Sequence, residues 1–214
     1  MRLGAVHRPR IRVRRAAPLV ATAAASAAGF ATVTALVSQR RTRGLDRRIR
    51  KDIGTSHSAE STAIVTALGY TGKSWVHGPA AALLAWYVEH RGSLDGSRAI
   101  NLASTMATTV SKTCDWALQH RTPPPGRHKR KEQSYPSGHT LETAAVTLVS
   151  AYVLWREDLA DPRVAFPVAA AIPLLEGAGR IFLDRHWTTD VIGGLLAGIS
   201  VAAVCASGYE ARRA

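Results

Sequence analysis

The sequence predicts an all-α membrane protein: a bundle of six transmembrane helices. Charged residues gather in short, mostly basic stretches, and long, nearly uncharged segments lie between them. Mean hydropathy is −0.03, because the two kinds of segment cancel in the average. With 214 residues there is room for one domain. We expect a basic N-terminal tail at 1–15 and a membrane-embedded domain at 16–214.

The first predicted span is Ala16 to Gln39, which has 24 residues without a charge. A bilayer core takes about 20 helical residues. An arginine-rich start, an apolar run and Arg14–Arg15 also fit a signal peptide or a twin-arginine signal. We favour a retained helix, because the run is longer than an ordinary signal core. The charge run Arg43 to Lys51 is expected to be an amphipathic interfacial segment that binds anionic lipid.

The next apolar segment, Ser61 to Val88, contains one charge, Lys73, and is punctuated by glycine and proline. This pattern predicts an interfacial helix that leads into a span near Ser74 to Val88. The other predicted spans are Arg98 to Leu118, Thr140 to Trp155, Val164 to Gly179 and Val191 to Tyr209.

Near the C-terminus, an arginine, a histidine and an aspartate are spaced for phosphoryl transfer. Five residues separate Arg180 from His186, and three separate His186 from Asp190. If Asp190 opens a helix, its carboxylate can hold one ring nitrogen of His186 and leave the other free to attack phosphorus. The planar guanidinium of Arg180 can bind two phosphoryl oxygens.

A second motif, Pro136-Ser137-Gly138-His139, precedes an apolar run and predicts a helix N-terminus, which attracts anions. The hydroxyl and amide of Ser137 can bind phosphate, and Gly138 lets the main chain approach closely. His139 is the natural general acid for the leaving oxygen, because the ordinary pKa of histidine lies near neutrality.

These residues resemble the type 2 phosphatidic acid phosphatase (PAP2) family, which is related to bacterial acid phosphatases and vanadium haloperoxidases. Its second motif, Pro-Ser-Gly-His, is intact at Pro136 to His139. Its third motif, Ser-Arg-x5-His-x3-Asp, is present with Gly179 in place of the serine. The motif-bearing resemblance runs from Asn101 to Cys205, within an expected active-site core at about 98–209.

The first family motif, a lysine six residues before an Arg-Pro pair, is altered here. Lys112 precedes Arg121 by eight intervening residues, and Thr122 separates that arginine from the prolines. Lys112 and Arg121 remain the candidates for phosphate binding. Other basic side chains in the following loop are alternative sources of the charge: Arg127, Lys129, Arg130 and Lys131.

The resemblance implies a six-helix membrane lipid phosphatase that needs no metal or cofactor. In that mechanism His186 forms a phosphohistidine, Asp190 supports it and His139 protonates the leaving group. The expected phosphate ligands are Lys112, Arg121, Ser137, Gly138 and Arg180. The expected substrate is a lipid phosphomonoester or diphosphate, such as phosphatidate, phosphatidylglycerophosphate or a polyprenyl (di)phosphate. Two rivals stay open: a vanadate-dependent haloperoxidase, and a catalytically silent membrane protein that binds or transports lipid.

Two carboxylates inside predicted spans are expected to support the site. Glu142 follows His139 by one helical turn and can orient it or complete a cap, and Glu176 precedes Arg180 by four residues, the spacing of a helical ion pair. His120 and His128 flank the predicted site loop and are candidate substrate contacts. The other histidines outside the motifs, His57, His77 and His90, are expected at the surface or interface, and Cys114 and Cys205 in the core.

The predicted spans bring all three motifs to one membrane face. With the N-terminus in the cytoplasm, that face is external, although basic residues on both sides of the first span leave the positive-inside rule undecided. A net charge of +13 is compatible with nucleic-acid binding, but no basic face alternates with aromatic residues. We therefore expect lipid substrate and membrane lipid as partners and no nucleic acid; the sequence leaves the oligomeric state open.

Overall fold

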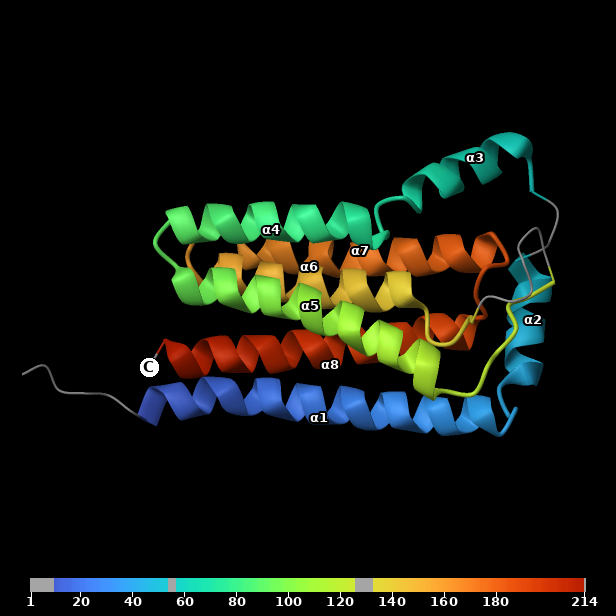
Figure 1. Ribbon diagram of the computed structural model, residues 1–214, viewed down its shortest axis with the longest axis horizontal. Coiled ribbons are helices and arrows are strands. Elements are labelled where there is room, and N and C mark those ends of the chain that lie inside the picture. Colours follow the sequence, from blue (N-terminus) through green and yellow to red (C-terminus); the bar gives the residue numbers. More distant parts are fainter. Residues whose placement is uncertain (1–9, 54–56, 126–132, 214) are drawn as a thin grey trace, which may run out of the picture.

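The computed structural model describes residues 10–53, 57–125 and 133–213, which are helical apart from connecting segments. Six long helices lie side by side in a bundle, and α2 and α3 lie toward one end of it (Figure 1). The helices are α1 (Arg10–Ser38), α2 (Arg43–Ile53), α3 (Ala59–Leu68), α4 (Ser74–His90), α5 (Leu94–Ala117), α6 (Gly138–Arg156), α7 (Pro162–Phe182) and α8 (Thr188–Arg212).

Each predicted span corresponds to one long helix, and the short helix α3 precedes α4 as the sequence predicts. By length and composition, three helices can cross a membrane: Ala16–Ser38 of α1, Pro162–Phe182 and Thr188–Arg212. The all-helical fold class is confirmed, and the count of six spans stays a prediction.

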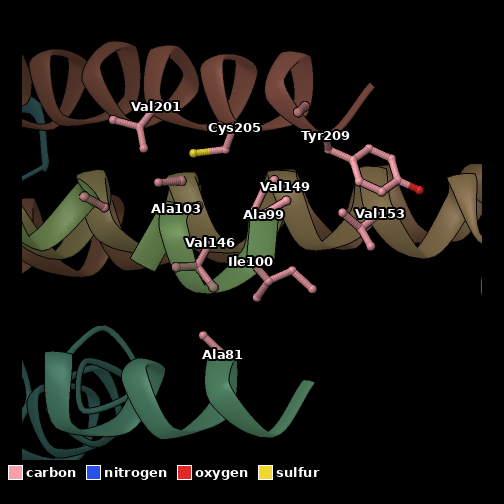
Figure 2. Close-up of a cluster of buried hydrophobic side chains, with 14 of the residues drawn as sticks. Ala81, Ala99, Ile100, Ala103, Val146, Val149, Val153, Val201, Cys205 and Tyr209 are labelled. Carbon is pink, nitrogen blue, oxygen red and sulfur yellow. The ribbon is translucent and has the colours of Figure 1, made fainter. Parts of the chain in front are cut away.

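The hydrophobic core lies between α4, α5, α6 and α8 (Figure 2). Alanines and valines predominate, and Ile100, Val149 and Tyr209 are fully buried among them. Cys205 also packs here, and Cys114 is buried in α5, so both cysteines are core residues as expected.

Two glycines let α8 approach α6 closely. A methyl group on Gly194 would lie 2.6 Å from the carbonyl oxygen of Ser137, and one on Gly198 would lie 2.5 Å from that of Leu141. Small residues at this spacing are typical of close helix pairs in membranes. Nearer the start of α8, the Ser137 amide donates to the Asp190 carbonyl oxygen at 3.0 Å and continues this contact.

The last turns of α5 and α7 and the first turns of α6 and α8 meet at the end of the bundle where α2 lies (Figure 1). This end therefore contains the second and third motifs together with the segment that follows α5. It is called the site end below.

Candidate active site

His186 lies in the short connection between α7 and α8, and one of its ring nitrogens is held by main chain. Its Nδ1 lies 2.7 Å from the carbonyl oxygen of Ser134. A carbonyl oxygen only accepts, so Nδ1 carries a proton, and in the neutral ring the lone pair is on Nε2. The ring is in the tautomer that a nucleophile requires.

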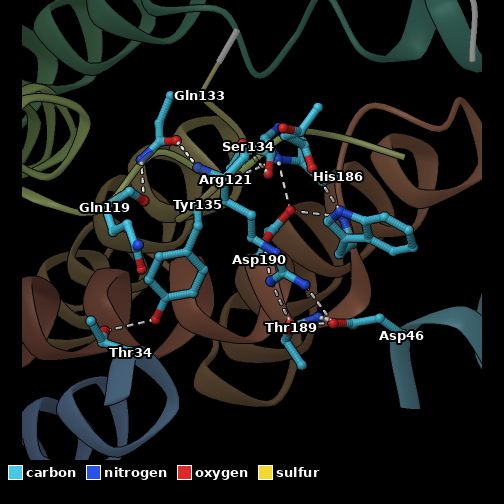
Figure 3. Close-up of polar contacts among 12 residues, drawn as sticks. Thr34, Asp46, Gln119, Arg121, Gln133, Ser134, Tyr135, His186, Thr189 and Asp190 are labelled. Carbon is cyan, nitrogen blue, oxygen red and sulfur yellow. Dashed lines mark hydrogen bonds and ion pairs between the residues drawn. The ribbon is translucent and has the colours of Figure 1, made fainter. Parts of the chain in front are cut away.

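Ser134 is itself fixed by the segment that follows α5. Its amide and its hydroxyl both donate to the carbonyl oxygen of Arg121, each at 3.0 Å. In return, the amide of Arg121 donates to the side-chain oxygen of Gln133 at 2.7 Å. Figure 3 shows this pairing beside His186. The main chain of Arg121 thus positions the group that orients the imidazole.

Asp190 does not hold the imidazole as the sequence predicts. Its Oδ2 lies 3.8 Å from Nδ1 of His186, beyond hydrogen-bonding distance. The reason is that this carboxylate has other donors: Oδ2 accepts from the Trp187 amide at 2.7 Å, and Oδ1 accepts from Arg121 at 2.6 Å. Asp190 therefore caps α8 and acts on the imidazole through its charge.

The side chain of Arg121 links the first motif to α2 and α8 (Figure 3). Its Nη1 donates to Asp190 and to Thr189 Oγ1, and its Nη2 donates to Oδ2 of Asp46 at 2.6 Å. Asp46 is 1% exposed and also accepts from the amide and the hydroxyl of Thr189. Both terminal nitrogens of Arg121 are bonded to carboxylates, so this arginine holds α2 and α8 together, and its role as a phosphate ligand stays a prediction.

The second motif forms a helix N-terminus as predicted, at the first turn of α6. Gly138 allows the close approach, because a methyl group there would lie 2.8 Å from Ser111 Oγ. Ser137 is fully buried; its amide bonds to α8, and its hydroxyl lies 3.0 Å from that of Thr140. The amides of the first turn after Ser137 remain as anion donors.

His139 lies close enough to both Arg180 and His186 for their charges to interact. Nε2 of His139 is buried and has no hydrogen-bond partner within the described ranges. Arg180 is 6% exposed and donates from Nη2 to the carbonyl oxygen of Gly69, in the turn between α3 and α4. The two histidines and the arginine of the motifs thus meet at the site end.

The two predicted supporting carboxylates have different partners. Glu176 pairs with Arg180 at 3.7 Å, at the predicted spacing, and accepts from the Thr71 hydroxyl. Among the described residues, Glu142 makes no hydrogen bond to His139; it lies 2.6 Å from His77 Nε2 and accepts from Ser74 at 3.0 Å. Glu142 therefore joins α6 to α4.

Lys112 forms no hydrogen bond or ion pair with a motif residue in the described part of the chain. Its side chain is 74% exposed and pairs with Asp115 at 3.9 Å, so phosphate binding by Lys112 stays a prediction. Its neighbour Ser111 is the buried residue that faces Gly138. Successive helical residues differ by about 100° around the axis, so one position decides whether a side chain points inward. The altered spacing of the first motif is consistent with this register.

The sequence predicts only lipid binding for α2, but this helix also contacts the segment that follows α5 and the connection between α7 and α8. Besides Asp46, Arg50 donates to Asp184 from Nε at 2.7 Å and from Nη2 at 3.0 Å, and to the carbonyl oxygen of Pro125 at 2.8 Å. The bond to Asp184 raises the pKa of Arg50, so this pair stays charged. The one feature of the sequence that could have indicated these contacts is Asp46, an isolated acid within a basic run.

The remaining histidines have varied environments. His77 is 7% exposed, contrary to the expected surface position, because Glu142 draws it inward. His57 stacks on Phe182 with ring centroids 3.7 Å apart, and His90 is exposed. His120 lines a cavity on the α2 side of Arg121. His128 and the four alternative basic residues, Arg127, Lys129, Arg130 and Lys131, lie outside the described residues.

Tyr135 forms part of the wall between the site end and α1. Its hydroxyl lies 2.8 Å from Thr34 Oγ1. Burial raises the pKa of Tyr135 to about 12, so the phenol stays neutral at physiological pH. Among the described residues, no group of three His, Cys, Asp or Glu side chains is placed to hold a metal ion.

Comparison with known proteins identifies the same motif region. The family model for the PAP2 superfamily matches residues 100–214. Phosphatidylglycerophosphatase B of Bacillus subtilis (strain 168) is 35% identical over 69 residues, which are 31% of this chain and 34% of that protein. The match thus spans about a third of that relative's length.

The fold has a close counterpart among solved structures. The crystal structure of a transmembrane PAP2 type phosphatidylglycerolphosphate phosphatase from Bacillus subtilis superposes with a TM-score of 0.78, at 20% identity, over 86% of this chain and 94% of that one. The likeness therefore covers α-helices that precede the family match as well as those within it. With more than half of its length matched by the family model, the chain belongs to the PAP2 superfamily, and it is an integral membrane protein.

Proposed function

We propose that this protein is a lipid phosphatase that hydrolyses a lipid phosphomonoester or diphosphate through a phosphohistidine. The observation that carries the proposal is the Nδ1 hydrogen bond of His186 to the Ser134 carbonyl oxygen, which in the neutral ring puts the lone pair on Nε2, in an imidazole close to His139. An imidazole fixed in this way is a nucleophile, and phosphorus is a suitable electrophile.

In the first step, Nε2 of His186 attacks phosphorus, and the bond from phosphorus to the lipid oxygen breaks. His139 gives its proton to that oxygen, so the oxygen of the broken bond carries no negative charge when the product leaves. The product is the lipid alcohol from a monoester or the lipid monophosphate from a diphosphate. The buried, unpartnered Nε2 of His139 is the atom available for this proton. In the second step, His139 takes a proton from water as the water oxygen displaces His186 from phosphorus.

Fixed positive charge stabilises the transition state, in which negative charge spreads over three phosphoryl oxygens. Arg180 supplies it together with the first-turn amides of α6. Nη2 of Arg180 donates to the carbonyl oxygen of Gly69, and in this proposal a phosphoryl oxygen takes the place of that acceptor. Asp190 stabilises the imidazolium through its charge at 3.8 Å.

An apolar groove between α4, α6 and α7 supports a lipid as the substrate. It has a volume of about 730 Å³, begins beside Thr71 and His77 near the site, and extends to Ala160 and Asp161 at the far end of α6. The 19 residues of α6 span roughly 28 Å at 1.5 Å per residue. A tail of membrane length can lie in this groove while the phosphate reaches His186.

The names of the two Bacillus relatives favour phosphatidylglycerophosphate as the substrate to test first. We place the site on the external face of the plasma membrane, because an N-terminus in the cytoplasm puts the end of α1 outside. A single cysteine introduced at Thr122 should react with an impermeant maleimide in intact cells, and one at Asp158 should not. The reverse labelling would contradict this orientation.

The decisive experiment is phosphate release by the purified full chain in detergent with EDTA, across phosphatidylglycerophosphate, phosphatidate and a polyprenyl diphosphate. His186→Ala should lower release by at least about 10³-fold, because it removes the nucleophile. His90→Ala, which changes an exposed histidine at the other end of α4, is the matched control and should keep the rate. Full activity of His186→Ala would refute the proposal.

A further inference from the structure

A second cavity lies at the site end, between the α1–α2 turn and the segment that follows α5. Its volume is about 460 Å³, within the range of roughly 300–1,000 Å³ that small-molecule pockets occupy. The residues that matter here are Arg40, Arg43, Arg47, Gln119, Arg121 and Thr122, and this cavity is called the basic cup below. Neither motif histidine nor Arg180 lines it.

The charge of the basic cup is uncompensated. Arg121 is neutralised by Asp46, the one acidic residue in the lining. Within the described ranges, no ion pair involves Arg40, Arg43 or Arg47, which are exposed residues of the lining, so one carboxylate is shared among four lining arginines. Like charges gathered around one space repel each other unless an anion binds between them.

The backbone of the α1–α2 turn adds an independent observation. Arg40 has a φ of 62°, a left-handed conformation in which glycine or asparagine is usual. It ends α1, because the amide of Arg41 returns to the carbonyl oxygen of Leu36 at 2.9 Å. A bulky cation at this position costs stability and gives the turn a charged side chain, a pattern that clusters at ligand sites.

The basic cup is connected to the catalytic histidine by direct bonds. Asp46, in its lining, holds Arg121 and Thr189 (Figure 3). Arg121 in turn holds Asp190 and, through its main chain, Ser134, which orients His186. A ligand that draws α2 toward the cup stabilises the contacts that position the nucleophile.

We infer that the basic cup is a second anion site, distinct from the catalytic one, which binds a phosphate group and stabilises the active arrangement of α2. The planar guanidinium of arginine can bind two phosphate oxygens at once, and the hydroxyl and amide groups of the lining provide further hydrogen-bond donors. The phosphate can belong to the headgroup of an anionic phospholipid or be free inorganic phosphate. Binding at this cup lies beyond the hydrolysis proposed above.

The test uses the full chain in neutral detergent and two double variants of equal charge. Arg43→Gln/Arg47→Gln removes two cup residues; Arg41→Gln/Arg48→Gln, on the same stretch, removes two arginines that do not line the cup. The probes are inorganic phosphate and short-chain phosphatidylglycerol, with phosphatidylcholine as the zwitterionic reference. Binding is titrated through the thermal unfolding midpoint.

We expect the cup variant to bind about tenfold more weakly than the control variant, since two charge-assisted contacts are lost. A difference with phosphate alone identifies free phosphate as the ligand, one with phosphatidylglycerol alone identifies the headgroup, and one with both identifies the phosphate group itself. Equal affinities of the two variants, or no binding beyond phosphatidylcholine and buffer, overturn the inference. If the double variant does not fold, Arg47→Gln against Arg48→Gln makes the same comparison.

Discussion

The polar and charged side chains at the two ends of the bundle differ in how completely they are hydrogen-bonded. At the end away from the motifs, Arg156 donates to Glu210 at 2.5 Å, and Glu157 accepts from Ser93 at 2.6 Å and from the Tyr209 hydroxyl. These side chains come from α6, α8 and the starts and ends of neighbouring helices, and each charge meets a partner. This end holds the helices in register.

The site end contains more ion pairs, yet several of the buried polar atoms described there have no hydrogen-bond partner. Among the described residues, five buried side-chain atoms have no hydrogen-bond partner, and four belong to this end: His77 Nδ1, His139 Nε2, Glu176 Oε2 and Thr188 Oγ1. A buried unpaired polar group costs about 1–3 kcal/mol. The difference teaches that one end is optimised for stability, while the other keeps polar atoms available for a substrate.

The strongest test of this contrast removes one arginine from each end. Arg121→Ala should lower phosphate release by about 10³-fold, because it removes the guanidinium that holds Asp190, Thr189 and Asp46 together. Arg156→Ala also breaks a buried pair, yet it should keep the rate of the folded protein within about threefold. Both variants are compared by turnover and by thermal unfolding in detergent. Equal losses of turnover in folded protein would erase the distinction between the ends.

The next test concerns the acid that sequence reasoning missed. Asp46→Asn should lower kcat by about 10²-fold with little change in KM, because a small displacement of the nucleophile is costly while the phosphate ligands remain. Asp52→Asn, an exposed acid on the same helix, is the control. If Asp46 serves only stability, the folded fraction of Asp46→Asn will keep the normal kcat.

A smaller effect is expected in the turn that covers the site. A methyl group on Gly72 would lie 2.7 Å from Glu176 Oε2 and 2.9 Å from His139 Cδ2, so Gly72→Ala should lower kcat by about tenfold through displacement of His139. Gly78→Ala meets no atom within 4 Å and should leave kcat unchanged. Steady-state kinetics on both variants decides, and equal kcat values would show that His139 tolerates the displacement.

The smallest effect is expected at Lys112. Because this side chain is 74% exposed, Lys112→Ala should change phosphate release by less than about twofold. A loss comparable to that of Arg121→Ala would show that the lysine turns into the site during turnover. The assay is the same phosphate release, with Arg98→Ala, an exposed cation at the other end of α5, as the comparison that should keep the rate.

Much of the architecture follows from local sequence. Uncharged runs predict the six long helices, and Pro136 to His139 predicts the start of α6, because helix periodicity and capping act over a few residues. The pairing of Glu176 with Arg180 likewise follows from their spacing on one helix. The exposed position of Lys112 could not be predicted from local spacing, because a shift of one residue turns a helical side chain by about 100°.

By itself, the sequence determined the helices, the membrane class and the residue types of a histidine-based phosphoryl-transfer site, because each depends on composition or short spacing. Only the tertiary structure decided what holds that site. The acceptor for His186 is a main-chain oxygen, which no residue type identifies, and Asp46 meets Thr189 across 143 positions of chain. Such contacts exist only once α1, α2 and α8 have packed, because that packing alone brings distant groups within hydrogen-bonding distance.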